Sequence, residues 1–163
     1  MPSTPLPKEP VTAVNATVGA EATIMKVTML LADAAQSVNG RLYILGGGWS
    51  VTGPDPQPMA IAIKVDIPWN DANKKYRFKL ALFDEDGQAV TVPTPTGDRP
   101  VEVEGGFEAG RPAGLTPGTP LDFALALNLG PLPLRPGTRF AWAFLVDGEE
   151  KERVAFSTRP PQP

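Results

Sequence analysis

The sequence predicts an all-β fold, an antiparallel two-sheet β-sandwich of about eight or nine short strands. Apolar and polar residues alternate with a period of two along most of the chain, and dipeptides typical of tight turns separate the alternating segments. The 20 prolines and 16 glycines among 163 residues exclude a long helix almost everywhere and lie mainly between these segments. An immunoglobulin-like or jelly-roll-like sandwich fits this pattern, and a closed barrel is the alternative.

The chain is expected to divide into an arm, one domain and a short tail. Residues 1–24 hold four prolines in the first ten positions and then small, nearly uncharged residues, which favours a flexible arm. A single β-sandwich domain is expected at 25–159, a length sufficient for a core of its own. Residues 160–163 form a C-terminal tail with three prolines.

The period-two pattern defines the strands, and it is clearest at residues 59–67, where β-branched side chains occupy one face. Each strand has one apolar and one polar face, as a two-layer core requires. In chain order, the apolar faces consist of Met25, Val27, Met29 and Leu31; Met59, Ile61, Ile63, Val65 and Ile67; Tyr76, Phe78, Leu80 and Leu82; Val101 and Val103; Leu121, Phe123, Leu125, Leu127 and Leu129; Phe140, Trp142, Phe144 and Val146; and Val154 and Phe156.

Turn signals join these segments. Asn39-Gly40 precedes an apolar segment at 41–45, and Asp147-Gly148 separates the last two strands. Both dipeptides tolerate the positive φ angles of a two-residue hairpin. A further turn is expected at residues 84–87. The one helix expected is a short one near residues 32–36, which read Ala-Asp-Ala-Ala-Gln.

The absence of histidine and cysteine narrows the possible chemistry. It excludes a Ser-His-Asp triad, a cysteine nucleophile, disulfides, zinc fingers and haem held by these residues. None of the serines lies in a Gly-x-Ser-x-Gly motif. We expect no cofactor and predict that the protein is not an enzyme.

Charge and hydropathy give expectations about location and partners. A net charge of −3, from 15 basic and 18 acidic residues, predicts no nucleic-acid partner. No apolar run approaches the roughly 20 residues that span a bilayer, and the N-terminus lacks the apolar core of a secretory signal. We therefore expect a cytoplasmic protein with no membrane partner.

A run of three glycines, Gly46, Gly47 and Gly48, links the apolar segment 41–45 to Trp49. Bare backbone lets a ligand or partner approach closely, so these four residues are interaction candidates. A bulge or a crossover between sheets, with Trp49 buried, explains the same residues and is the commoner situation. The run is not a phosphate loop, because the lysine and Ser/Thr of that motif are missing.

Two charged stretches each have a functional and an ordinary interpretation. Asp84, Glu85 and Asp86 supply three carboxylates in one turn, which makes them weak candidates for a calcium site, although an exposed acidic turn is commoner. Lys74 and Lys75 open a basic stretch in which aromatic and charged residues alternate. Alternation separates the two kinds of side chain on opposite faces, which favours a solvated strand; docking of an anionic partner is the alternative.

Trp69 is the best candidate for an exposed aromatic residue, because it lies in the polar segment Pro68-Trp69-Asn70-Asp71. Trp49, Trp69 and Tyr43 are side chains of the kind that stack on sugar rings. Exposed aromatics are equally what protein interfaces use, and the sequence leaves both interpretations open.

The start of the domain and the glycine run resemble a known group of proteins. Met25-Lys-Val-Thr with the following Leu-Ala-Asp, and Leu42-Tyr-Ile-Leu-Gly-Gly-Gly-Trp49, are similar to an uncharacterised bacterial family of actinobacterial type. Pro68-Trp69 and residues 134–148 fit the same family. The resemblance covers residues 25–159 and implies one β-sandwich domain. It implies no catalytic residues, because the family has no assigned activity.

These observations favour a non-catalytic β-sandwich protein that binds another protein or itself, as a subunit or accessory of a larger assembly. The alternative is a module that binds carbohydrate or another small ligand through loop aromatics. A carboxylate- or metal-dependent hydrolase is the third hypothesis, and no spacing of carboxylates points to a particular catalytic pair.

Overall fold

The computed structural model describes residues 24–163, which fold into 11 strands and one short 3-10 helix. Residues 1–23, and with them nearly all of the expected arm, lie outside the described residues. The elements are β1 (Lys26–Val38), β2 (Arg41–Gly47), β3 (Val51–Thr52), β4 (Met59–Ile67), η1 (Trp69–Asp71), β5 (Tyr76–Asp84), β6 (Thr91–Thr94), β7 (Gly97–Pro100), β8 (Glu102–Phe107), β9 (Leu121–Leu129), β10 (Arg139–Val146) and β11 (Glu149–Thr158).

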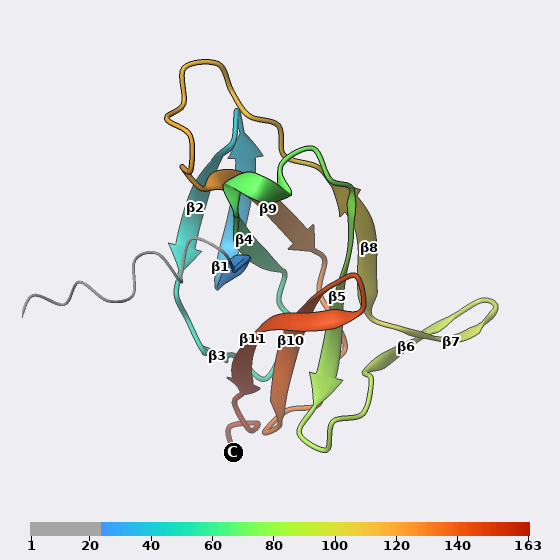
Figure 1. Ribbon diagram of the computed structural model, residues 1–163. Coiled ribbons are helices and arrows are strands. Elements are labelled where there is room, and N and C mark those ends of the chain that lie inside the picture. The colour runs from blue at the N-terminus through green and yellow to red at the C-terminus, as the bar shows by residue number, and fades with distance from the viewer. Residues whose placement is uncertain (1–23) are drawn as a thin grey trace, which may run out of the picture.

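The strands form two main sheets and a separate hairpin (Figure 1). One sheet has the order β2-β1-β4-β9, the other has the order β3-β11-β10-β5-β8, and β6 pairs only with β7. All neighbours are antiparallel except β3 and β11. The prediction of an all-β, largely antiparallel fold is therefore confirmed.

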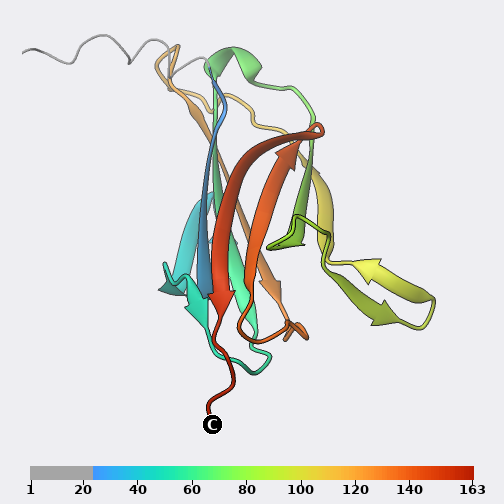
Figure 2. The same ribbon diagram turned by 90° about the horizontal axis from the view of Figure 1, so that it is seen from below.

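The expected number of eight or nine strands is too low, because the short strands carry little periodicity. β3 has two residues, and β6 and β7 have four each. The β6–β7 hairpin projects away from the two main sheets (Figure 2). Pro93 and Pro100 are tolerated in it, because neither strand has, among the described strands, a neighbour on its outer edge that would need a backbone N–H.

Residues of both main sheets form one hydrophobic core. Ile61, Ile63 and Val65 from β4 and Trp142 and Phe144 from β10 are completely buried. The period-two pattern correctly predicted these inward faces. Each buried side chain of this size contributes about 1.5–3 kcal/mol, so the core is the main source of the stability of the fold.

The short helix expected at residues 32–36 does not form, because these residues belong to β1. The predicted hairpin turn follows directly, with positive φ at Asn39 (50°) and Gly40 (72°). Pairing between β1 and β4 ends at Ala32 and Ala60, and pairing between β1 and β2 continues to the turn. The second half of β1 and β2 therefore form a hairpin, residues 33–47, that extends beyond β4.

This hairpin lies against the outer face of the sheet. The Asn128 amide of β9 accepts a hydrogen bond from the Ala35 N–H at 3.1 Å and donates one to the Ala35 carbonyl at 2.7 Å. The Ser37 hydroxyl donates to the Ala124 carbonyl at 3.0 Å. Small side chains permit this close packing: Ala32, Ala35, Ala60 and Ala62 form a second buried cluster, with Leu42 and Ala126 against it. The outer face of β4, expected to be solvated, is thus partly covered.

Candidate functional site

β2 is an edge strand whose large side chains are exposed. It pairs with β1 on one side and has no neighbour on the other among the described residues, and it forms an outer margin of the molecule (Figure 1). Tyr43 is 56% exposed, Ile44 41% and Leu45 70%. The register places Tyr43 opposite Gln36 and Leu45 opposite Ala34, so Tyr43 and Leu45 lie on one face of the hairpin.

The backbone of Ile44 points its polar groups towards the free edge. In an antiparallel pair, residues that do not bond to each other direct their N–H and C=O groups away from the partner strand. Ala35 stands opposite Ile44, and its N–H and C=O bond to Asn128 instead. Ile44 therefore faces away from β1 with both groups, and Leu42, two residues earlier, has the same orientation. This edge offers hydrogen bonds to another strand.

The other sheet edges are less open to pairing. β3 contains only two residues, which limits the length of any added strand. β8 carries Glu102 and Glu104, which form ion pairs with Lys79 at 3.6 and 3.3 Å. Charged side chains along an edge are a common device against unwanted pairing. β9, the fourth edge, is about as long as β2, but residues 122, 124, 126 and 128 along its outer face are polar or alanine.

The glycine run ends β2 and turns the chain into the core. Gly46 has a φ of 61°, and the Asp33 carboxylate lies where a Cβ would be built on it. The Gly48 N–H donates to the Leu31 carbonyl at 2.7 Å. Trp49 then packs edge-on against Phe156, with ring centroids 6.0 Å apart. Gly46 and Gly47 thus lie in the exposed strand, whereas Trp49 is half-buried and its indole N–H is buried without an acceptor in the described chain.

A polar cavity of about 470 Å³ adjoins the glycine run. Asp33 and Trp49 line it together with Gln57 and Arg159. Among residues 24–163, neither Asp33 nor Arg159 takes part in an ion pair. The cavity therefore presents two charges of opposite sign beside an aromatic ring.

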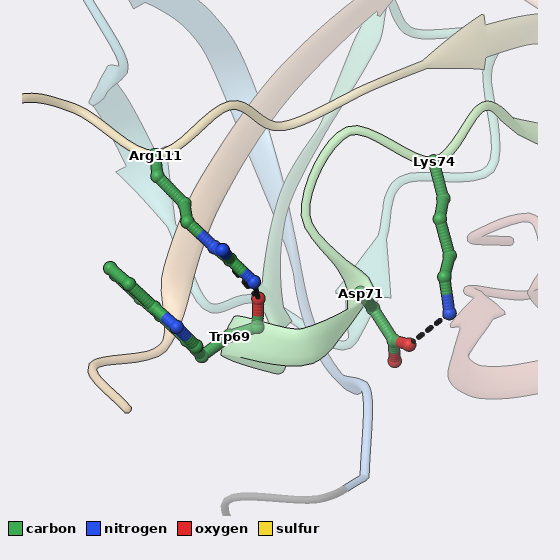
Figure 3. Close-up of polar contacts among 4 residues, drawn as sticks. All are labelled: Trp69, Asp71, Lys74 and Arg111. Carbon is green, nitrogen blue, oxygen red and sulfur yellow. Dashed lines mark hydrogen bonds and ion pairs between the residues drawn. The ribbon is translucent and has the colours of Figure 1, made fainter. Parts of the chain in front are cut away.

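Trp69 lies at the start of η1 rather than in an irregular loop. The Arg111 guanidinium stacks over the indole at 4.4 Å from its centroid and donates to the Trp69 carbonyl at 2.7 and 3.2 Å (Figure 3). These contacts hold the ring in place and cover one of its faces. Trp69 also packs against the core and is half-buried, so it is a less open stacking surface than the sequence suggested.

The two lysines after η1 have different surroundings. Lys74 donates to Asp71 at 2.8 Å (Figure 3), and this hydrogen bond and the carboxylate charge raise the pKa of the lysine. Lys75 lines a cavity of about 350 Å³ with Tyr76 and Phe107, whose rings stack at 5.3 Å. The predicted separation of faces is confirmed, because Phe78 is buried and Arg77 is exposed.

The acidic turn is organised by one of its carboxylates. Asp84 accepts hydrogen bonds from the backbone N–H groups of Asp86 and Gln88, both at 2.9 Å. Glu85 and Asp86 are exposed. Within the described part of the chain, no group of three or more acidic side chains converges as a metal site would require.

The sequence predicted the apolar segment 41–45 and indicated Tyr43 and the glycines as candidates, but it did not predict that the whole strand is exposed. Leu42, Tyr43, Ile44 and Leu45 are four consecutive large apolar residues, a run typical of a strand buried on both faces. The run follows the Asn39-Gly40 turn, so it forms the second strand of a hairpin. This strand has no polar face, and that feature could have predicted an exposed apolar surface. Arg111 was also missed, because it lies 42 residues from Trp69 in a proline- and glycine-rich segment.

Comparisons with known proteins give a family but no activity. No curated protein matches the chain. A solved structure of an alkylpurine DNA glycosylase from Pseudomonas fluorescens, bound to DNA containing an abasic-site analogue, is similar with a TM-score of 0.44 and 14% identity. The match covers 84% of this chain and 31% of the glycosylase chain. A likeness of this size carries no argument about function.

This structure of a DNA-bound protein stands against the prediction that nucleic acid is not a partner; we withdraw that prediction and infer no DNA binding from the match. The net charge on which it rested is a property of the whole chain and does not describe how charge is distributed locally.

No helix among residues 24–163 has both the length and the apolar character to cross a membrane. The model of a family of unknown function, DUF6941, matches residues 27–159. The chain therefore belongs to this family of unknown function.

Proposed function

We propose that the protein is a non-catalytic binding protein that takes up an extended polypeptide strand at the free edge of β2. The exposure of Tyr43, Ile44 and Leu45 on an edge strand that has no outer neighbour among residues 24–163 is the observation that supports this function. Addition of a strand to a sheet edge combines main-chain hydrogen bonds, which supply affinity, with alternate side chains, which supply specificity.

The energetics of β2 favour this use. A buried apolar surface contributes roughly 25 cal/mol per Å², and a tyrosine side chain covers about 150–250 Å². More than half of Tyr43 and of Leu45 is available for burial. An added strand covers these side chains and supplies partners to the outward N–H and C=O groups of Leu42 and Ile44.

Replacement of Ile44 by proline tests the function. Proline removes the outward N–H but no bond of the β1–β2 ladder, because Ile44 does not bond to Ala35. A display library of extended peptides is selected on the full chain, and binding of the selected peptides is measured by fluorescence anisotropy. We expect Ile44→Pro to reduce affinity at least tenfold.

The control is Leu115→Lys, which changes another exposed apolar residue, in the segment between β8 and β9. It is expected to bind the selected peptides as the wild type does. Equal binding by Ile44→Pro and the wild type, or a selection that yields no peptide, would contradict the proposed function.

The cavity of Asp33, Trp49 and Arg159 supports a second candidate, binding of a small polar ligand such as a saccharide. Its volume lies in the usual range for ligand sites. Titration of a saccharide panel, followed by the intrinsic fluorescence of the chain, tests it. Arg159→Met is expected to abolish any response, whereas Arg135→Met, an exposed control, retains it.

We also propose that the two main sheets pack as a β-sandwich of immunoglobulin-like or jelly-roll-like type. The single core shared by β4 of one sheet and β10 of the other supports this arrangement.

A further inference from the structure

We propose that the strand added to β2 is β2 of a second copy of this chain, which makes the protein a two-fold symmetric dimer. This inference rests on the proposed function and names the partner. The four-stranded sheets of the two copies then become one continuous antiparallel sheet. Four features of β2 lead to this occupant: its backbone polarity, its sequence, its charge and its exposed area.

The backbone fixes the register. Leu42 and Ile44 direct their N–H and C=O groups to the free edge. Two identical strands in an antiparallel pair are related by a two-fold axis. When all seven residues of Arg41–Gly47 pair with their copy, the axis passes through the middle residue, Ile44. Ile44 then bonds to Ile44 of the second copy, and Leu42 stands opposite Gly46.

The side chains complement one another in this register. Tyr43 stands opposite Leu45 of the second copy, and the reverse contact is identical by symmetry. Aromatic–aliphatic neighbours on adjacent strands contribute about 0.2–1 kcal/mol per pair beyond alanine. Leu42, on the other face, meets a glycine, so no second large side chain competes for the space beside Ala35 and Ala62.

The charge of β2 is also compatible with self-pairing. Arg41 is the one charged residue of the strand, and in this register it stands opposite Gly47 of the second copy. No like charges therefore meet across the axis. In contrast, β8 carries two carboxylates, Glu102 and Glu104, along an edge of the other sheet.

The exposed area sets the expected strength. A standard interface buries about 800 Å² per partner. Three side chains that are 41–70% exposed supply only part of this area, so the dimer is expected to dissociate at micromolar concentrations rather than to be obligate.

Sedimentation equilibrium of the full chain over a range of concentrations tests the dimer. We expect a concentration-dependent dimer for the wild type and for Leu115→Lys. Ile44→Pro and Leu45→Lys are expected to weaken association at least tenfold. Leu45 is 70% exposed, so its replacement leaves the core intact, and it provides a second variant in case proline disturbs the strand.

A wild type that stays monomeric up to about 1 mM would overturn the dimer. Dimerisation that neither Ile44→Pro nor Leu45→Lys weakens would do the same. The proposed function is separable from this result. If the wild type is monomeric but binds the selected peptides in a manner that Ile44→Pro abolishes, strand binding stands and the partner is a different protein.

The register is tested by disulfide trapping, for which the absence of native cysteine gives a clean background. Tyr43→Cys mixed with Leu45→Cys should form a cross-linked heterodimer under oxidising conditions, because directly opposite Cβ atoms lie about 4.5–5.5 Å apart. Each variant alone should cross-link much less, since diagonal positions lie about 7–8 Å apart. Efficient self-cross-linking of Tyr43→Cys, with no cross-linked heterodimer in the mixture, would overturn the register.

Discussion

At Gly46 the local structure depends on the absence of a side chain. Its φ of 61° lies in the left-handed region, and a Cβ would overlap the Asp33 carboxylate. Gly40 has a similar φ of 72°, but nothing lies within 4 Å of the corresponding Cβ position. Substitution therefore strains the backbone at both glycines, but it creates a steric overlap only at Gly46.

We therefore predict that Gly46→Ala destabilises the fold more than Gly40→Ala. Backbone strain alone costs about 1–2 kcal/mol at either position. The contact with Asp33 should add about 1 kcal/mol at Gly46, because the carboxylate has to move. Urea denaturation of the two variants measures the difference. Equal losses would show that Asp33 moves away freely, and Asp33→Ala should reduce the excess if the contact is its cause.

At the scale of elements, the side-chain amide of Asn128 makes two of the hydrogen bonds that hold the hairpin of residues 33–47 to the sheet. Asn128 takes the place of a neighbouring strand for Ala35: its amide oxygen accepts from the Ala35 N–H, and its amide nitrogen donates to the Ala35 carbonyl. An apolar residue at this position would leave both groups without their protein partner. The orientation of the free β2 edge therefore depends on a residue of β9.

We predict that Asn128→Ala costs about 1 kcal/mol of unfolding free energy and speeds hydrogen exchange of the Ala35 amide. Exposed Asn70→Ala is the matched control and should leave both quantities unchanged. Asn128→Asp keeps the acceptor for the Ala35 N–H but places a carboxylate beside the Ala35 carbonyl. It should therefore protect the Ala35 amide better than Asn128→Ala does; an unaltered exchange rate in Asn128→Ala would contradict the role.

The elements also show how far sequence patterns reach. β4 was predictable because one face is buried in the main core, so apolar side chains recur every second residue. The second half of β1 was not, because Ala-Asp-Ala-Ala-Gln has a weak strand propensity and becomes a strand through pairing with β2 and Asn128. The strand β2 was predicted from the Asn39-Gly40 turn before it, but its exposure was not, since exposure is set by the absence of a neighbouring strand among the described residues and not by the strand's own sequence.

At the scale of the whole molecule, the edge strands of the two main sheets differ in length and in the side chains that they expose. In the part of the chain that the structure describes, one edge strand has only two residues, one carries ion-paired glutamates, one has small and polar side chains on its outer face, and β2 is apolar and has no outer neighbour. Proteins usually protect edges with charge, proline or shortness. A partner strand can therefore pair with β2 at the smallest loss of folding stability, because this pairing changes neither the core nor the other edge strands.

The pH dependence of stability is also a property of the whole molecule. Carboxylates that accept hydrogen bonds raise the pKa of three lysines: Asp66 acts on Lys64, Asp71 on Lys74 and Glu104 on Lys79. Burial raises the pKa of Tyr76. The ordinary values are 10.5 for lysine and 10.0 for tyrosine. In each case the folded chain binds the proton more tightly than the unfolded chain.

The stability that these groups contribute is fully present below their unfolded pKa values and is lost as pH rises through the higher folded values. We predict that the free energy of unfolding declines above about pH 10. Urea titrations at a series of alkaline pH values measure it. Tyr76→Phe should show a shallower decline, because it lacks the half-buried phenol. An unfolding free energy that increases with pH over this range would contradict the direction of all four shifts.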